Sequence, residues 1–226
     1  MAATSTTKTG QAGKTPEPAK TKWGDRERRR ADILGAARAR ITEHGYLACS
    51  MRDIAADAGV SPATLYSYFA TKEELFATLY AEAIRAHTET LRPIVGAGHD
   101  LTTLLALVFE AYLDLYASFC RHFTLWSAMR HDADADAAPF PIELIVELRA
   151  ATLENNRLLM DGIRAAAQLE GRRVVDEQLV PSFLWSSLNG LADHFTSERR
   201  SLDGFPASRL VEFAAQRIAI AITELT

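Results

Sequence analysis

The chain has 226 residues, of which 48% are hydrophobic and 24% charged, the composition of an ordinary globular protein. This length suits one domain with a small partner domain and excludes a large multidomain enzyme. The formal net charge of −4 argues against a nucleic-acid-binding protein, but the charges are unevenly spread. Residues 1–75 carry 12 Lys and Arg against 9 Asp and Glu, whereas residues 76–226 carry 13 against 20. A basic front on an acidic body predicts that the N-terminal part faces a polyanion.

The cysteine and hydropathy patterns predict a cytoplasmic protein with no membrane partner. Cys49 and Cys120 have no metal-ligand spacing, and two reduced thiols are expected. No stretch approaches the roughly 18 apolar residues that a membrane span needs. The first 24 residues contain no apolar signal-peptide region.

Helix start and stop signals follow one another closely in the first quarter of the chain. Residues 1–24 are rich in Thr, Ala, Lys and Gly and predict a disordered basic arm. A helix then ends at Gly45. Ser50, Ser61 (which precedes a proline) and Thr71 are N-caps of three further helices. Glu74, three residues after Thr71, can accept a hydrogen bond from the Thr71 N–H, as in a capping box.

The remainder of the chain also shows helical periodicity. The helix after Thr71 is expected to stop near Pro93. Apolar residues then recur over residues 101–126 after an Asp100 N-cap, and further helices are predicted over 141–171, 181–197 and 206–224. No stretch alternates as a strand does. The sequence therefore predicts an all-α fold.

Residues 51–58 and 62–69 are two short helices joined by Gly59, Val60 and Ser61, which is the spacing of a helix-turn-helix. In this motif the second helix enters the major groove of DNA. Its outer side carries small and hydroxyl-bearing side chains, which allow close approach to base edges. The basic front end thus has a DNA-reading element at its centre.

Several segments of this region resemble the TetR family of bacterial transcriptional regulators. They are Ala36-Ala37, Gly45-Tyr46, the run from Ser50 to Ala55, the run from Ala58 to Ser61, and the run from Leu65 to Glu73, all within residues 26–85. The resemblance implies a homodimer with an N-terminal three-helix DNA-binding domain (residues 25–75). It also implies a C-terminal helical ligand-binding and dimerisation domain (residues 76–226).

The resemblance also implies DNA-facing roles for individual residues. Arg52 is expected near a base or phosphate, Ala63 and Thr64 near bases, Ser67 in the groove, and Tyr66, Tyr68 and Lys72 at the backbone. Ser50, at the start of a helix, is added because N-terminal N–H groups favour a phosphate. The alternatives are that these side chains are merely solvated, and that Tyr66 packs. The run Arg26–Arg30 is either an ordinary solvated helix start or a DNA contact.

Aromatic side chains gather on the helices of the second domain. Each could be a core residue, but as a group they are candidates to line an effector pocket with a few polar side chains. The candidate ligand-binding residues are Phe109, Tyr112, Tyr116, Trp126, Trp185 and Asn189. The effector expected from such a lining is apolar or aromatic.

The last two predicted helices carry apolar faces that are either intrachain core or, as the family resemblance favours, a two-fold four-helix dimer interface. No catalytic constellation, phosphate loop or cofactor motif is present, so no enzyme and no cofactor are expected. The acidic run His131–Asp136 lacks the spacing of a calcium loop, and no metal is predicted.

The sequence predicts a ligand-responsive repressor that binds a palindromic double-stranded DNA operator as a dimer and is released by a small molecule. The alternative is an architectural or protein-partnered DNA-binding regulator with no small-molecule effector.

Overall fold

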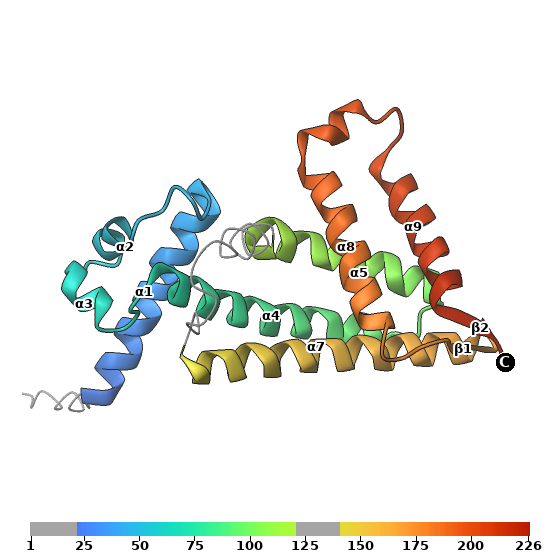
Figure 1. Cartoon of the computed structure of the whole chain (residues 1–226), viewed down its shortest axis with the longest axis horizontal. Helices are drawn as coiled ribbons and strands as arrows, with labels where there is room; N and C mark the ends of the chain where they lie inside the picture. The colour runs from blue at the N-terminus through green and yellow to red at the C-terminus, as the bar shows by residue number, and fades with distance from the viewer. Residues whose placement is uncertain (1–21, 121–140) are drawn as a thin grey trace, which may run out of the picture.

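The computed structural model describes residues 22–120 and 141–226, which are almost entirely helical (Figure 1). At the N-terminal end lie α1 (Lys22–His44), α2 (Met51–Asp57) and α3 (Pro62–Tyr66). The predicted arm (residues 1–24) lies outside the described residues except at its end, where α1 already begins at Lys22. The all-α fold class is confirmed.

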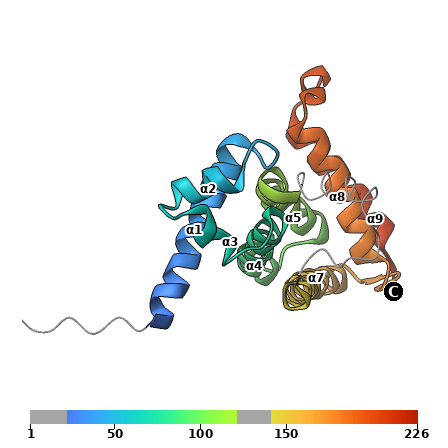
Figure 2. The same cartoon turned by 60° about the vertical axis from the view of Figure 1, so that its left-hand side comes forward.

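Longer helices form the rest of the molecule. They are α4 (Lys72–Gly96), α5 (Leu101–Leu115), α7 (Ile142–Leu169), α8 (Val180–Thr196) and α9 (Ala207–Ile222). A π-helical turn, η1 (Tyr116–Cys120), continues α5, and a 3₁₀ turn, η3 (Glu198–Leu202), joins α8 to α9. Helices α4 and α7 pack along their length. Figure 2 shows α1–α3 on one side of the molecule and α8 and α9 on the other, with α4 and α5 between them.

The predicted helix starts are confirmed by side-chain caps. Ser50 accepts a hydrogen bond from the Asp53 N–H at 3.2 Å. Likewise, Ser61 accepts from the Thr64 N–H at 3.1 Å, and Thr71 accepts from the Glu74 N–H at 3.0 Å. Asp100 caps α5 through the Thr103 N–H at 3.0 Å. Such caps depend only on local sequence, which is why the sequence predicts them well.

Two local predictions are wrong. Glu74 accepts from the Ala70 N–H at 2.8 Å and not from the Thr71 N–H, so its long side chain reaches one residue further than in a capping box. Helix α4 does not stop at Pro93 but includes it and ends at Gly96. Pro93 lies in the last turn on the exposed side, so the carbonyl of Glu89 that loses its donor is close to solvent.

One small sheet was not predicted. Strands β1 (Arg172–Val174) and β2 (Thr223–Leu225) pair antiparallel, with Arg172 opposite Leu225. The Arg172 guanidinium also donates to the Thr223 hydroxyl at 2.7 Å. Three residues are too few to show an alternating pattern, and the partner lies about fifty residues away. The sheet ties the end of α9 to the end of α7.

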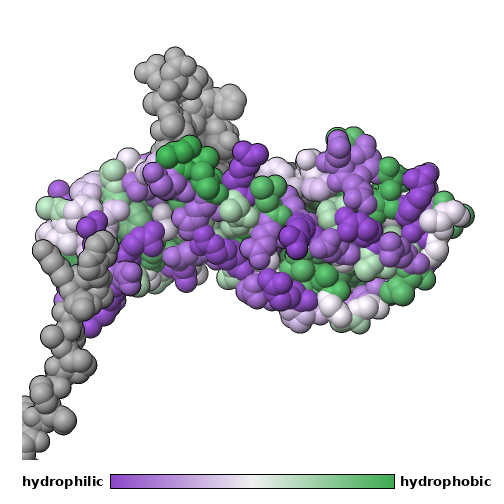
Figure 3. Space-filling model, turned by 90° about the horizontal axis from the view of Figure 1, so that it is seen from below, coloured by the Kyte–Doolittle hydropathy of each residue, from purple (hydrophilic) through white to green (hydrophobic). Residues whose placement is uncertain are grey.

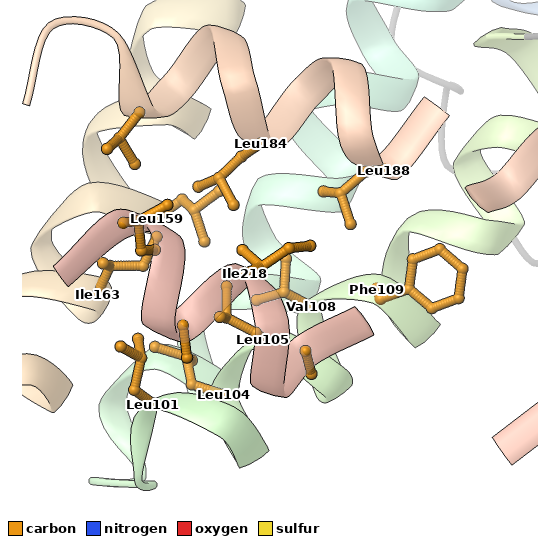
Figure 4. Close-up of a cluster of buried hydrophobic side chains, with 14 of the residues drawn as sticks. Leu101, Leu104, Leu105, Val108, Phe109, Leu159, Ile163, Leu184, Leu188 and Ile218 are labelled. Atoms are coloured by element: carbon orange, nitrogen blue, oxygen red, sulfur yellow. The ribbon is translucent and has the colours of Figure 1, made fainter. Parts of the chain in front are cut away.

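Two hydrophobic cores lie along α4, one toward each of its ends. The N-terminal core packs α1, α2 and α3 against Leu75, Phe76 and Leu79 of α4. The C-terminal core packs Leu91 of α4 against the other helices. Figure 4 shows the centre of this second core, where Leu101, Leu104, Leu105, Val108, Phe109, Leu159, Ile163, Leu184, Leu188 and Ile218 meet. Helix α4 therefore connects the two cores physically.

The segment Leu101–Phe119, formed by α5 and η1, is long and apolar enough to cross a membrane by length and composition alone. The expectation that no stretch comes near this limit is therefore wrong. Within the described residues, most of its large apolar side chains are buried among α4, α7, α8 and α9, which accounts for its composition. In the face shown in Figure 3, hydrophilic side chains predominate between separate hydrophobic patches.

Candidate nucleic-acid interface

The α2–α3 pair is held rigidly on α1. Gly59, at φ +64°, makes the turn between the two helices, a backbone conformation that side chains with a Cβ rarely adopt. Ile54 and Leu65 are fully buried against α1. From α1, the Arg40 guanidinium forms a bidentate pair with Asp57 at 2.5 and 3.0 Å. The guanidinium lowers the pKa of the Asp57 carboxyl through that hydrogen bond.

The residues expected to face DNA lie on α2, α3 and the start of α4. Ser50, Arg52, Ala63, Tyr66 and Ser67 are exposed, whereas Thr64, Tyr68 and Lys72 are half-buried. Tyr66 is 53% exposed, so it does not pack as a core residue. Among the described residues, Arg52 has no hydrogen-bond or ion-pair partner. The exposed members all belong to α2, α3 or the residues next to them, and these helices lie on one side of the molecule (Figure 2).

The hydroxyls in and next to α3 are already hydrogen-bonded within this segment. Ser61 Oγ lies 2.9 Å from Thr64 Oγ1, and Ser67 Oγ donates to the Thr64 carbonyl at 2.6 Å. The Ser67 proton is therefore occupied, which leaves its oxygen as an acceptor toward solvent. These bonds fix the hydroxyls in place, so any contact they make to DNA is made from a defined position.

Lys72 is held against an aromatic ring. Its Nζ lies 4.1 Å from the centroid of the Tyr46 ring, and the Tyr46 hydroxyl donates to Glu73 Oε1 at 3.2 Å. Burial lowers the pKa of the Lys72 ammonium and, together with Glu73, raises the pKa of the Tyr46 hydroxyl. Cys49 lies buried nearby, its thiol bonded to the Gly45 carbonyl at 3.1 Å.

The arginines of α1 are a part of this surface whose role the sequence left open. Arg26 lies over the Tyr68 ring at 5.5 Å, and Arg30 lies over the Phe69 ring at 5.3 Å. No carboxylate of the described residues pairs with Arg26, Arg28, Arg29 or Arg30. Spacing of three and four residues on α1 was the signal that Arg26, Arg29 and Arg30 share one side of the helix.

The predicted effector residues do not line one cavity among the described residues. Phe109, Tyr112 and Tyr116 are core residues, and the Tyr112 hydroxyl donates to Asn189 Oδ1 at 2.9 Å. Trp185 is instead 52% exposed. Trp126, like the acidic run 131–136, lies outside the described residues. No group of three metal-ligating side chains occurs in the described part of the chain.

A groove of about 320 Å³ lies elsewhere, between α1, α4, α5 and η1. Its lining includes His87, which is only 8% exposed and makes no hydrogen bond with any described residue. Burial lowers the pKa of the His87 imidazole to about 4, so the ring is neutral at pH 7. Arg38 of α1 and Glu82 of α4, joined by an ion pair at 2.6 Å, also line the groove.

Comparison with known proteins agrees with this geometry. Residues 33–79 match the family model of bacterial regulatory proteins of the tetR family. An uncharacterised HTH-type transcriptional regulator of Mycobacterium tuberculosis H37Rv is 42% identical over 53 residues, 24% of this chain and 25% of that protein. The chain thus matches the first of its curated relatives over about a quarter of their length.

Two further similarities extend beyond residues 33–79. The HTH-type transcriptional repressor KstR2 of Rhodococcus jostii is 31% identical over 140 residues, 60% of this chain and 66% of that protein. The structure of the regulator FadR from Bacillus subtilis in complex with stearoyl-CoA aligns with a TM-score of 0.57 at 19% identity. That alignment covers 85% of this chain and 98% of the other, and it shows the shared fold.

Proposed function

The chain belongs to the TetR family of bacterial regulatory proteins, and from this we propose that it is a transcriptional regulator, a repressor that binds a palindromic DNA operator in the cytoplasm. The observation that carries the proposal is the outer face of the helix-turn-helix. There Arg52, Ala63, Tyr66 and Ser67 are exposed together on a rigidly packed motif.

The exposed apolar surface of α8 and α9 supports the proposal that the chain binds as a homodimer. In the predicted faces, Leu184, Leu188, Ile218 and Ile222 belong to the chain's own core. Other large apolar side chains remain exposed on the same two helices, namely Phe183, Trp185, Phe213 and Ile220, together with Leu179 at the N-cap of α8. Two helices from each protomer would bury these side chains in a four-helix interface. The recognition helices would then enter successive major grooves about 34–36 Å apart.

We place the effector in the groove that contains His87. A neutral buried imidazole with no hydrogen-bond partner among the described residues can give and accept one hydrogen bond, and leaving it unpaired costs free energy. The groove also has apolar walls, including Ala83, Leu115 and Phe119. An apolar or aromatic molecule with one hydrogen-bonding group fits this lining.

An effector in this groove would contact helices that belong to both hydrophobic cores. The groove touches α1 through Arg38 and the C-terminal core through α5. A molecule that binds better when α1 and α4 are displaced would lower DNA affinity, since only differential affinity shifts a conformational equilibrium.

The decisive experiment is an unbiased operator selection from random duplexes, followed by a mobility-shift assay. Sequence-specific binding that weakens with salt is expected, and Thr64→Ala or Ser67→Ala should change the preferred bases. If no duplex is enriched, the proposal of a DNA-binding regulator is wrong.

A compound screen for release from the selected operator then separates the two kinds of regulator. Compounds that release the wild-type protein from the operator but do not release the His87→Phe variant would support the effector groove. If no compound releases DNA or raises the melting temperature, the alternative of a protein-partnered regulator is favoured.

A further inference from the structure

An open cleft of about 640 Å³ lies between the start of α1 and the recognition helix α3. One wall carries Asp25, Arg26 and Arg29 of α1. The opposite wall and the floor are formed by the turn and α3, through Gly59, Val60, Ser61, Thr64, Ser67 and Tyr68. Two guanidinium groups therefore share one cleft with four hydroxyls, and this cleft opens beside the helix expected to enter the major groove.

We propose that this cleft seats one backbone phosphate of the operator, bound by Arg26 and Arg29 and by the one hydroxyl proton that the Ser61–Thr64 pair leaves free. The proposal rests on the DNA-binding function proposed above and adds to it the residues that fix how α3 sits in the groove. Phosphate contacts of this kind set register and orientation, whereas base contacts set sequence preference.

The charges of these arginines are available to an external anion. Elsewhere in the described chain Arg38, Arg40, Arg85, Arg92 and Arg164 all pair with carboxylates. Arg26 and Arg29 have no such partner among the described residues, although both are exposed. A planar guanidinium matches phosphate oxygens through two parallel hydrogen bonds.

Arg26 is also held in place before DNA arrives. Its guanidinium carbon lies 5.5 Å from the centroid of the Tyr68 ring, a cation–π geometry. The Ser61 and Thr64 hydroxyls are fixed by their mutual contact at 2.9 Å. Groups that need little further ordering lose less conformational entropy when a phosphate binds.

The same helix offers a matched control. Arg28 is exposed, lacks a carboxylate partner among the described residues, and does not line the cleft. At 100° per residue it lies about 160° around the helix from Arg26. Arg28→Ala therefore removes the same charge from the same helix without touching the cleft. Asp25, which does line the cleft, should repel a phosphate, so Asp25→Asn should tighten binding.

The test measures operator binding by fluorescence anisotropy over a range of salt concentrations. For Arg29→Ala, the negative slope of log affinity against log salt should become shallower by about 0.9 per protomer, and affinity at 0.1 M salt should fall by about eightfold per protomer. Arg28→Ala should change both much less. Circular dichroism melts establish that each variant is folded.

Methylphosphonate substitution then identifies the phosphate. In duplexes with one neutral linkage at a time, one position should weaken wild-type and Arg28→Ala binding equally but weaken Arg29→Ala binding much less, because only Arg26 then remains on that phosphate. The cleft proposal is overturned if Arg28→Ala matches Arg29→Ala, or if no linkage has a smaller effect on Arg29→Ala than on the wild type. Either result would leave operator binding itself intact, whereas failure of the wild type to bind any duplex would overturn the proposed function instead.

Discussion

The Lys72 ammonium lies 4.1 Å from the centroid of the Tyr46 ring, at the first residue of α4. The ring holds the charge at the start of the helix that connects the two cores. Because Lys72 is half-buried there, its desolvation lowers the pKa of the ammonium. Phosphate binding at this position would replace some of the lost hydration.

Lys72→Ala should weaken binding to all duplexes, whatever their sequence. The lost phosphate contact should make the negative slope of log affinity against log salt shallower by about 0.9 per protomer, without changing the preferred bases. Anisotropy titrations of one specific and one scrambled duplex at several salt concentrations measure both effects. An unchanged salt slope would show that Lys72 does not contact a phosphate.

The same residue should make binding sensitive to alkaline pH. A lowered pKa means that Lys72 loses its charge at a lower pH than an ordinary lysine, which titrates near about 10.4. Wild-type affinity should therefore fall relative to Lys72→Arg as the pH rises toward about 10. The other lysines titrate in both proteins and cancel in the comparison. Parallel pH profiles of the two proteins would contradict the assignment.

His87 should make stability depend on acid. Its pKa is about 4 in the folded protein, where burial disfavours the imidazolium, and about 6.5 in the unfolded chain. Between these values the unfolded state binds the extra proton, so stability is full above about pH 6.5 and is lost as the pH falls toward 4. The loss at full extent is about 3 kcal/mol.

Urea unfolding of wild type and His87→Gln at several pH values measures this contribution as a difference. The difference in unfolding free energy should be constant above about pH 7 and should shift in favour of the variant as the pH falls. Other titrating groups are common to both proteins. A difference that stays flat down to pH 4 would mean that His87 is not buried as the structure shows.

The sequence predicted the features that depend on neighbouring residues and failed where distant ones decide. The caps at Ser50, Ser61, Thr71 and Asp100 involve partners three residues away, so the pattern contains both members. The strand pairing of Arg172 depends on Leu225, about fifty residues later in the sequence.

The candidate sites divide in the same way. The exposed face of α3 follows from helical periodicity, so Ala63 and Ser67 were identified from the sequence alone. Periodicity cannot say which aromatic residue meets a cavity, because that depends on how helices cross. Phe109 is therefore buried in the core while Trp185 is exposed, and the groove is lined by His87 instead.

Gly162 should be needed for the close packing of α7 on α4. A Cβ added there would lie 2.8 Å from Val95 Cγ1, closer than side chains pack. Gly162→Ala gains about 1 kcal/mol of helix propensity but overpacks the contact, which costs about 1–3 kcal/mol. We expect a net loss of stability in urea unfolding that the second change Val95→Ala relieves.

Gly35 in α1 is the control for this pair. A Cβ there meets nothing within 4 Å, so Gly35→Ala should stabilise the protein by up to about 1 kcal/mol. If Gly162→Ala is equally stabilising, the contact with Val95 yields without cost and the prediction fails.

A row of aromatic rings connects η1 with Lys72. The Phe119 ring of η1 lines the effector groove, and its centroid lies 6.0 Å from that of Phe76. The centroid of Phe76 in turn lies 4.6 Å from that of Tyr46, the ring that the Lys72 ammonium contacts. If this row transmits the state of the groove to the DNA-binding end, substitutions at its two ends should not act independently on operator affinity.

A double-mutant cycle with Phe119→Leu and Lys72→Ala measures that coupling, and Phe109→Leu provides the matched control. Phe109 is 3% exposed and its ring lies 5.5 Å from Phe195 in the C-terminal core, away from Phe76. Both leucine variants should cost about 1 kcal/mol of stability. The effect of Phe119→Leu on operator affinity should change by about threefold or more when Lys72 is replaced, while that of Phe109→Leu should be unaffected. Additive effects at both positions would show that α4 moves as a rigid rod and that the rings do not carry the coupling.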